Sequence, residues 1–244
     1  MRLTVLGAYG SFPGADGACT GYMVEADGLH VLLDCGNGVL SRLQRYVGVQ
    51  DLDGIFVSHL HFDHMADLLV LRYGLDTMRV LQPSFRPLLL HLPETPPDIA
   101  GLLAHDEVFT RTFIHDGMLV QLGAMTLTFV RMAHPVETYA VSITAGGRKL
   151  FYSSDTVYTP RLAEAAQDAD LFLCEATAIE GRPAAPGLPH LTARQAAEVA
   201  AQAEVGQLLL THYWFELPAE EYVAQARTVF PRSALAEELV TYDV

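Results

Sequence analysis

The chain has 244 residues, of which 50% are hydrophobic and 18% are charged, so it can bury a core of ordinary size. This composition excludes a disordered chain, a fibre and a disulfide-stabilised miniprotein. The 29 acidic and 15 basic residues give a formal net charge of −14, which argues against general binding of nucleic acids or acidic membranes.

The first half of the chain is rich in predicted strands. Short apolar runs bounded by Gly, Asp or Asn are typical of strands, and they occur at residues 3–6, 21–25, 30–33 and 54–58. Apolar residues at positions 39, 40, 43, 46 and 47 have helical spacing and predict a helix over 37–47. We expect a second helix to begin near Asp63 and run through Leu71, followed by a strand near 88–91 and a helix near 98–103.

Strand patterns return between Phe109 and Thr156 and include a hairpin that turns at 145–147. After it we expect helices over 161–167, 192–203 and 218–229, strands over 171–174 and 207–211, and one closing strand. Thr192 is a good N-cap, with Gln195 at the capping-box position. Two strand-rich halves with flanking helices imply an α/β fold of two packed sheets covered by helices on both outer faces. Because no linker or charge run divides the sequence, we expect one domain over 1–244.

The cysteines and the N-terminus bear on the cellular compartment. Cys19, Cys35 and Cys174 are odd in number and form no C-x-x-C motif, so we expect small buried side chains rather than a disulfide framework. The apolar stretch after Met1 is too short for a signal peptide or a membrane span, and no longer one follows. A cytoplasmic protein that does not bind membranes is expected.

The segment 58–64 concentrates titratable side chains where a predicted strand ends and a predicted helix begins. His59, His61 and Asp63 alternate along an extended chain and can converge, and His64 enters from the first turn of the helix. Four titratable side chains that converge on one point cost free energy unless a cation binds them. Imidazole with carboxylate suits Zn²⁺, with Fe²⁺ or Mn²⁺ as alternatives.

His134, Asp155 and His212 each end an apolar run, where a side chain can project from the rim of a sheet. Each of them alone would be read as an ordinary core or surface residue. Together with the 58–64 segment they make seven candidate ligands, which is enough for two divalent ions.

The order His59, His61, Asp63, His64, His134, Asp155, His212 resembles the metallo-β-lactamase superfamily of binuclear hydrolases over essentially the whole chain. The resemblance implies a four-layer αββα sandwich. It implies that His59, His61 and His134 hold one metal, that Asp63, His64 and His212 hold the other, and that Asp155 bridges them. The turn at 32–36 is similar to the family's second-strand turn, in which Asp34 would be a buried structural acid.

Within this superfamily the β-lactamases place a cysteine at the second metal, and this chain has none at the Asp155 position, which disfavours antibiotic hydrolysis. Residues 174–177 are similar to the His-Glu-Ala-Thr motif of the ribonuclease Z and phosphodiesterase branch, and 189–197 are similar to its His-x-Thr-Ala helix start. In that branch the histidine matching His190, steadied by the glutamate matching Glu175, donates a proton. The alternative for His190 is a helix-capping or surface histidine.

The expected function is therefore a binuclear zinc phosphodiesterase that uses a metal-bridging hydroxide, with Asp63 accepting a hydrogen bond from it and His190 as general acid. Ribonuclease Z carries a long tRNA-gripping arm between the positions of His134 and Asp155, where this chain has about twenty residues around one hairpin. We therefore favour a small phosphodiester or ester substrate over tRNA. Alternatives are a ribonuclease Z-like tRNA 3′-processing endoribonuclease, a hydrolase of other esters, or a metal-stabilised binding protein without turnover. A homodimer is also considered.

Three further features remain open in the sequence. The glycine-rich segment 10–17 either lines the cleft or is an ordinary connection. The aromatic residues at 213–215 either form a pocket wall for a base or aryl group or pack in the core. The remaining histidines are expected to be ordinary surface or core residues without catalytic partners; they are His30, His91, His105 and His115.

Overall fold

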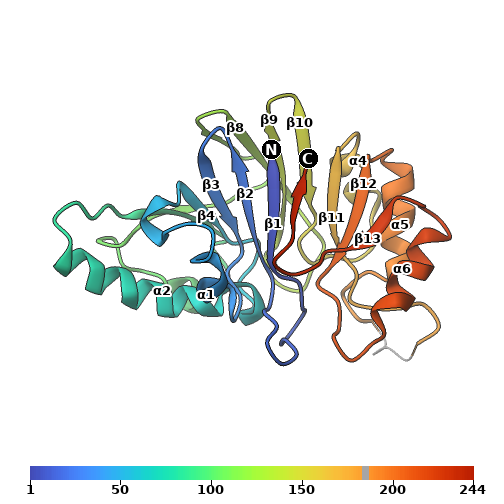
Figure 1. Ribbon diagram of the computed structural model, residues 1–244, viewed down its shortest axis with the longest axis horizontal. Coiled ribbons are helices and arrows are strands. Elements are labelled where there is room, and N and C mark those ends of the chain that lie inside the picture. Colours follow the sequence, from blue (N-terminus) through green and yellow to red (C-terminus); the bar gives the residue numbers. More distant parts are fainter. Residues whose placement is uncertain (183–186) are drawn as a thin grey trace.

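The computed structural model describes residues 1–182 and 187–244 and contains two seven-stranded sheets packed face to face (Figure 1). The first sheet contains β1 (Arg2–Gly7), β2 (Gly21–Ala26), β3 (Leu29–Leu33), β4 (Gly54–Phe56), β5 (Leu88–Leu92), β6 (Phe109–Phe113) and β14 (Thr241–Asp243). The second contains β7 (Leu119–Leu122), β8 (Met125–Arg131), β9 (Tyr139–Ala145), β10 (Arg148–Tyr152), β11 (Leu171–Glu175), β12 (Gln207–Thr211) and β13 (Ser233–Leu235). Their strand orders are β14-β1-β2-β3-β4-β5-β6 and β13-β12-β11-β10-β9-β8-β7.

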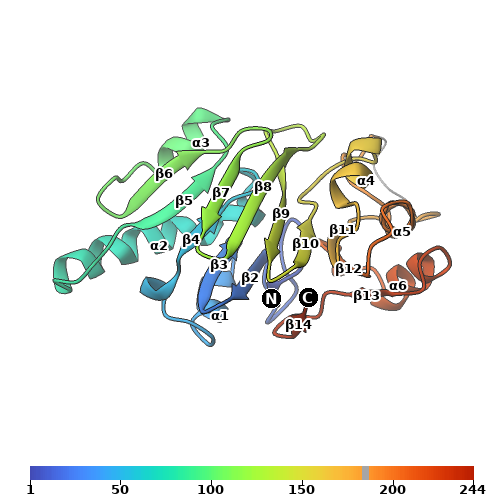
Figure 2. The ribbon, with the colours of Figure 1, turned by 90° about the horizontal axis from the view of Figure 1, so that it is seen from above.

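Helices cover the outer face of each sheet (Figure 2). The first sheet is covered by α1 (Val39–Leu43), α2 (Phe62–Leu81) and α3 (Pro97–Leu102), and the second by α4 (Pro160–Ala166), α5 (Ala193–Gln202) and α6 (Ala219–Arg227). A short 3₁₀ turn, η1 (Val49–Asp51), precedes β4. The predicted arrangement of two helix-covered sheets is confirmed. In the part of the chain that the structure describes, every helix is too short or too polar to cross a membrane.

The strands of the first sheet are apolar at nearly every position because both of their faces are buried. In β2, Tyr22 and Val24 face the core between the sheets, whereas Met23 faces the helices. In β3, Val31 lies in the inner core and Leu32 in the outer one. Since successive strand side chains point to opposite faces, a sheet covered on both sides produces the continuous apolar runs seen in the sequence.

Two helices differ in length from their prediction. The helix predicted over 37–47 is only α1, because Tyr46 donates to the carbonyl of Leu43 at 2.9 Å and ends the helix as a tight turn. The helix predicted to run through Leu71 continues to Leu81. It ends where Gln82 takes an extended conformation ahead of Pro83, as residues before proline prefer.

The local predictions in the second half hold well. The β9–β10 hairpin turns at Gly146 and Gly147, whose φ angles of 58° and 75° suit glycine. Thr192 and Gln195 form the predicted capping box of α5. The three cysteines are buried and free, as expected. The prediction of a single closing strand was wrong, because the chain ends in two strands. β13 pairs with β12, and β14 returns to the first sheet beside β1.

Candidate metal centre

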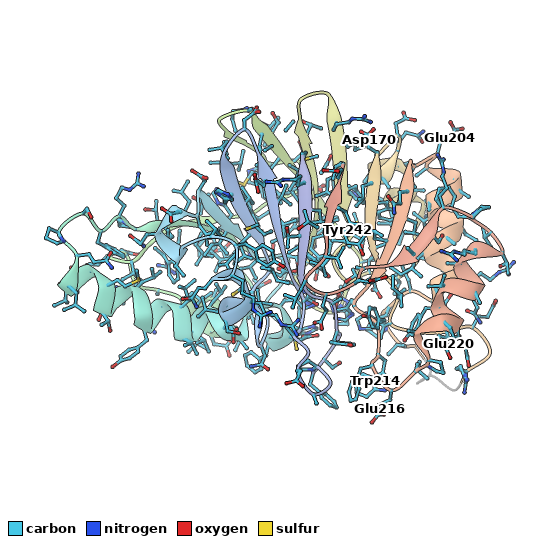
Figure 3. The ribbon with its side chains drawn as sticks, viewed as in Figure 1. Asp170, Glu204, Trp214, Glu216, Glu220 and Tyr242 are labelled. Carbon is cyan, nitrogen blue, oxygen red and sulfur yellow. The ribbon has the colours of Figure 1, made fainter. Side chains whose placement is uncertain are left out.

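The seven predicted ligands converge at one edge of the two sheets, where the loops that follow the strands meet. Trp214, two residues after His212, lies at this edge in Figure 3. His59 and His61 lie between β4 and α2, and the first turn of α2 carries Asp63 and His64. The other three follow β8, β10 and β12; they are His134, Asp155 and His212.

The ligand atoms fall into two groups. The first contains His59, His61, His134 and Asp155, whose ligand atoms lie within 4.8 Å of one another. His61 Nδ1 is 3.0 Å from His59 Nε2 and 3.3 Å from His134 Nε2. His59 Nε2 is in turn 3.5 Å from Asp155 Oδ2. This group could hold one divalent ion.

The second group contains Asp63, His64 and His212. Asp63 Oδ2 is 3.1 Å from His212 Nε2 and 3.8 Å from His64 Nε2. Asp155 Oδ2 lies 3.4 Å from His212 Nε2 and 3.5 Å from His64 Nε2. Asp155 Oδ2 therefore faces both groups.

Two buried atoms at this centre lack partners among the described residues. His64 Nε2 and Asp155 Oδ1 are both buried without a hydrogen bond. Leaving buried polar atoms unpaired costs about 1–3 kcal/mol each, and more for charged groups. A cation between the two groups would satisfy His64 Nε2 and balance the buried charge of Asp155, so the residues present fit divalent metal ions.

The protonation states also suit a cation. Burial lowers the pKa of His59, and it lowers the pKa of His134 to about 4, so both imidazoles are neutral. Burial alone would raise the pKa of Asp63, but the charge of His64 and the hydrogen bond from His212 outweigh it and lower that pKa. Neutral imidazoles and ionised carboxylates are the forms that coordinate divalent ions. His64 differs from His59 and His134, because the neighbouring carboxylates outweigh its burial and raise its pKa, so it would have to release the Nε2 proton to bind an ion.

Asp34 orients His64 from behind. This carboxylate is fully buried, as expected for a structural acid, and accepts hydrogen bonds from Ser58 Oγ at 2.8 Å and Tyr152 Oη at 2.7 Å. His64 Nδ1 lies 2.9 Å from the same Asp34 oxygen, Oδ2. With Nδ1 donating to Asp34, Nε2 is the nitrogen that faces the centre.

Two other histidines are oriented in the same way. His134 Nδ1 is 3.2 Å from the carbonyl oxygen of Pro189, and His212 Nδ1 is 2.9 Å from Thr177 Oγ1. In each ring Nε2 then points into the centre. Such partners set the tautomer of a metal-binding histidine. Thr177 is the last residue of the 174–177 motif, and its contact with His212 is a role that the motif match did not assign.

Glu175 and His190 form a pair beside the ligands. Glu175 is fully buried, and its Oε1 accepts from Thr156 N at 2.7 Å and lies 3.1 Å from His190 Nδ1. The His190 side chain is 15% exposed, and Nδ1 lies 3.8 Å from Asp155 Oδ2. Burial lowers the pKa of His190, but the hydrogen bond and charge of Glu175 raise it to about 9. His190 therefore holds a proton at the edge of the centre. It does not cap α5, because the N-cap of that helix is Thr192.

The glycine-rich segment 10–17 lies against the centre. Ser11 N donates to Asp63 Oδ2 at 2.6 Å. A Cβ on Gly10 would lie 2.7 Å from His212 Cε1, so only glycine leaves room for that ring. The sequence signal for both contacts was the glycine content of this loop, which did not by itself distinguish them from an ordinary connection.

The aromatic run at 213–215 divides between the two readings. Tyr213 packs in the core with its ring 5.1 Å from that of Tyr9, and Phe215 packs 5.3 Å from Phe12. Trp214 instead lines a cavity. The core reading therefore holds for Tyr213, whereas Trp214 lines a cavity and Phe215 is half-buried against the exposed ring of Phe12.

The remaining histidines lie outside the two ligand groups. His91 is buried and stacks on Phe56. His105 Nε2 lies 3.3 Å from Asp76 Oδ1, near Glu107. Arg79 pairs with both of these carboxylates, as is ordinary for charged residues at a surface.

Residues 30–213 match the family model described as the beta-lactamase superfamily domain. The chain belongs to this superfamily. It is 30% identical over 230 residues to the probable metallo-hydrolase YhfI of Bacillus subtilis, in an alignment that covers 94% of each chain. It is 29% identical over 296 residues to a ribonuclease Z of Bradyrhizobium sp., in an alignment that covers 98% of each chain. The crystal structure of the metallo-beta-lactamase fold protein YhfI superposes with a TM-score of 0.93 at 28% identity, covering 99% of this chain and 98% of that one. The predicted superfamily and its sandwich fold are confirmed.

Proposed function

We propose that this superfamily member is a cytoplasmic, single-domain phosphodiesterase that uses two divalent ions, Zn²⁺ by preference with Mn²⁺ or Fe²⁺ as alternatives. The observation that carries the proposal is the position of Asp155. One of its oxygens lies within 3.5 Å of histidines from both ligand groups, while the other is buried without a partner among the described residues. A mononuclear site would not need this carboxylate between two sets of ligands.

The proposed mechanism assigns a role to each group of residues. His59, His61 and His134 would hold one ion, Asp63, His64 and His212 the other, and Asp155 would contact both. Two such ions activate water and neutralise the charge of a phosphate. Asp63 would accept a hydrogen bond from the attacking water. His190, with Nδ1 held by Glu175, would donate its Nε2 proton to the leaving oxygen.

A small phosphodiester is favoured over tRNA. Where a gripping arm would be required, the chain forms the β9–β10 hairpin, which turns at Gly146 and Gly147. The net charge of −14 also opposes the binding of a large polyanion. The second candidate is tRNA 3′ processing, which the similarity to a ribonuclease Z over 98% of both chains supports. A homodimer stays a prediction, which light scattering on the purified protein tests.

Metal analysis tests the binuclear centre. The wild-type protein should carry close to two divalent ions per chain, and Asp155→Ala should lose ions and activity together because both groups lose their shared anion. Asp106→Ala is the matched control, since that side chain is 87% exposed and distant from the ligands in the sequence. A single, undisturbed ion in Asp155→Ala would refute the binuclear assignment.

Substrate comparison tests the activity. We expect a higher kcat/KM for bis(p-nitrophenyl) phosphate than for precursor tRNA, measured side by side at fixed salt. Efficient, site-specific cleavage at the tRNA 3′ end would instead favour the second candidate. Full metal occupancy with no turnover of any ester would identify a metal-stabilised binding protein.

A further inference from the structure

A cavity of about 240 Å³ adjoins the candidate metal centre. Its polar edge is formed by Ser11, which donates to Asp63 at 2.6 Å, and by Thr177, whose hydroxyl lies 2.9 Å from His212 Nδ1. Its remaining wall is largely apolar and includes Ile179, Leu188, Trp214 and Leu217. We call this space the Trp214 cavity. Two of its lining residues, Ser11 and Thr177, contact the candidate ligands Asp63 and His212, so the cavity lies beside the centre.

The indole of Trp214 is held in place from several sides. Its Nε1 donates to Glu216 Oε2 at 3.2 Å, and its backbone N–H donates to Tyr222 Oη at 3.1 Å. The ring of Phe12 meets it edge to face at 5.0 Å between centroids. Figure 3 shows Trp214 and Glu216 together at this edge of the molecule. A large aromatic side chain fixed in this way is preorganised as a binding wall.

The charge and size of the cavity limit what can occupy it. Arg182 is the one cationic side chain in its lining among the described residues, and it is already paired with Glu221, with 3.0 Å between Nε and Oε2. The described part of the lining therefore offers no unpaired charge to an ionic group. The volume is below the roughly 300–1,000 Å³ typical of a pocket for a whole drug-sized ligand. It suits one flat, uncharged ring system.

We propose that the Trp214 cavity binds a nucleobase or aryl ring attached to the phosphodiester while the phosphate occupies the metal centre. The inference rests on the proposed phosphodiesterase activity and specifies the substrate class as ring-bearing diesters. Apolar contact with Leu188 and Leu217, which are half-buried, and stacking or edge contact with Trp214 supply the recognition, because every base or aryl group has an aromatic face. Trp214 is thus a specificity-determining residue.

Trp214 is the single tryptophan of the chain, so its fluorescence reports directly on the cavity. Metal-loaded protein is titrated separately with thymidine 5′-monophosphate, phenyl phosphate and methyl phosphate. We expect saturable quenching by at least one ring-bearing monoester and none by methyl phosphate, and the two ring-bearing ligands distinguish a base site from an aryl site. Equal quenching by all three, or by none, overturns the proposal.

Kinetics provide the second readout. With p-nitrophenol as the common leaving group, the thymidine or phenyl diester should have a kcat/KM about tenfold above that of the methyl diester, as expected for one stacked ring. Trp214→Leu should remove this preference, and Leu217→Phe, which narrows the cavity from another wall, should do the same. Tyr73→Leu is the matched control because Tyr73 is 77% exposed on α2. A ring preference unchanged in both cavity variants overturns the proposal.

The failures of the two proposals can be told apart. Quenching by ring-bearing monoesters without hydrolysis of any diester would contradict the phosphodiesterase and leave the cavity assignment standing. Hydrolysis of diesters without ring preference or quenching would contradict the cavity assignment and leave the phosphodiesterase standing. Metal content and melting temperature of each variant confirm that it is folded.

Discussion

At the residue scale, the candidate metal centre is surrounded by strained backbone. Asp34, Ser154 and His212 have φ angles of 57°, 52° and 53°, in the left-handed region that non-glycine residues rarely occupy. Each such residue costs on the order of 1–3 kcal/mol and persists only where its surroundings hold it. For His212 the carbonyl oxygen is held by Thr177 Oγ1 at 3.0 Å. The left-handed backbone places His212, a candidate ligand, and Ser154, the neighbour of Asp155, in positions that an extended strand end would not give them.

His190→Ala separates the proton donor from the ligands. Because His190 contacts Glu175 and lies outside the seven-ligand set, the variant should keep its metal content while kcat falls by roughly 10²- to 10⁴-fold. Diesters with good leaving groups need less protonation and should suffer less. Equal losses for leaving groups of different basicity, measured in parallel, would contradict the general-acid role.

Gly10→Ala tests the contact behind His212. The added Cβ would lie 2.7 Å from the imidazole, so the ring must move and metal affinity should fall by roughly 10- to 100-fold, as for other groups that support metal ligands. Isothermal titration of the metal-free variant measures this loss. Gly74→Ala is the matched control, since its Cβ meets nothing within 4 Å. Equal affinities in the two variants would show that the Gly10 contact is unimportant.

At the element scale, α5 and the loop before it connect stability to the centre. The loop contributes the Pro189 carbonyl to His134 and supplies His190, and Thr192 then begins the helix. Leu191 N also donates to Glu175 Oε2 at 3.2 Å. A defined start of α5 therefore helps to hold His190, the proposed proton donor, and His134, a proposed ligand, in place.

Thr192→Ala removes the capping box and should lower the free energy of unfolding by about 1 kcal/mol. For a chain of this size that corresponds to a fall in Tm of roughly 2–4 °C. Thr192→Ser retains a hydroxyl that can accept from Gln195 N and should keep most of the stability. Calorimetry on both variants makes the comparison, and an alanine variant as stable as the serine one would contradict the contribution of the cap.

At the scale of the whole molecule, the centre joins the two sheets. The loop after β4 brings His59 and His61 from the first sheet, and the strand ends of the second sheet bring Asp155 and His212. Buried atoms from both sides lack other partners in the described structure. A bound cation would therefore cross-link the two halves of the sandwich.

Removing the metal should lower the Tm of the wild-type protein by several degrees, because a ligand that binds only the folded state stabilises it. Adding Zn²⁺ back should restore the original value. Calorimetry before and after chelation measures the shift, with elemental analysis to show that the ions were removed. In Asp155→Ala the same treatment should produce a much smaller change. An unchanged Tm in fully metal-free wild-type protein would contradict the cross-linking role.

The sequence by itself determined the order of most strands and helices, the β9–β10 turn, the cap of α5 and the set of residues that converge at the centre, although the metal-binding role of that set stays a prediction. These features follow from local periodicity, turn chemistry and residue type, which a short window of sequence contains. Only the tertiary structure decided that β14 pairs with β1, that Ser11 supports Asp63 and that Trp214 lines a cavity while Tyr213 is buried. Those outcomes depend on packing between segments far apart in the chain, such as the 52 positions between Ser11 and Asp63, and no local pattern encodes such contacts.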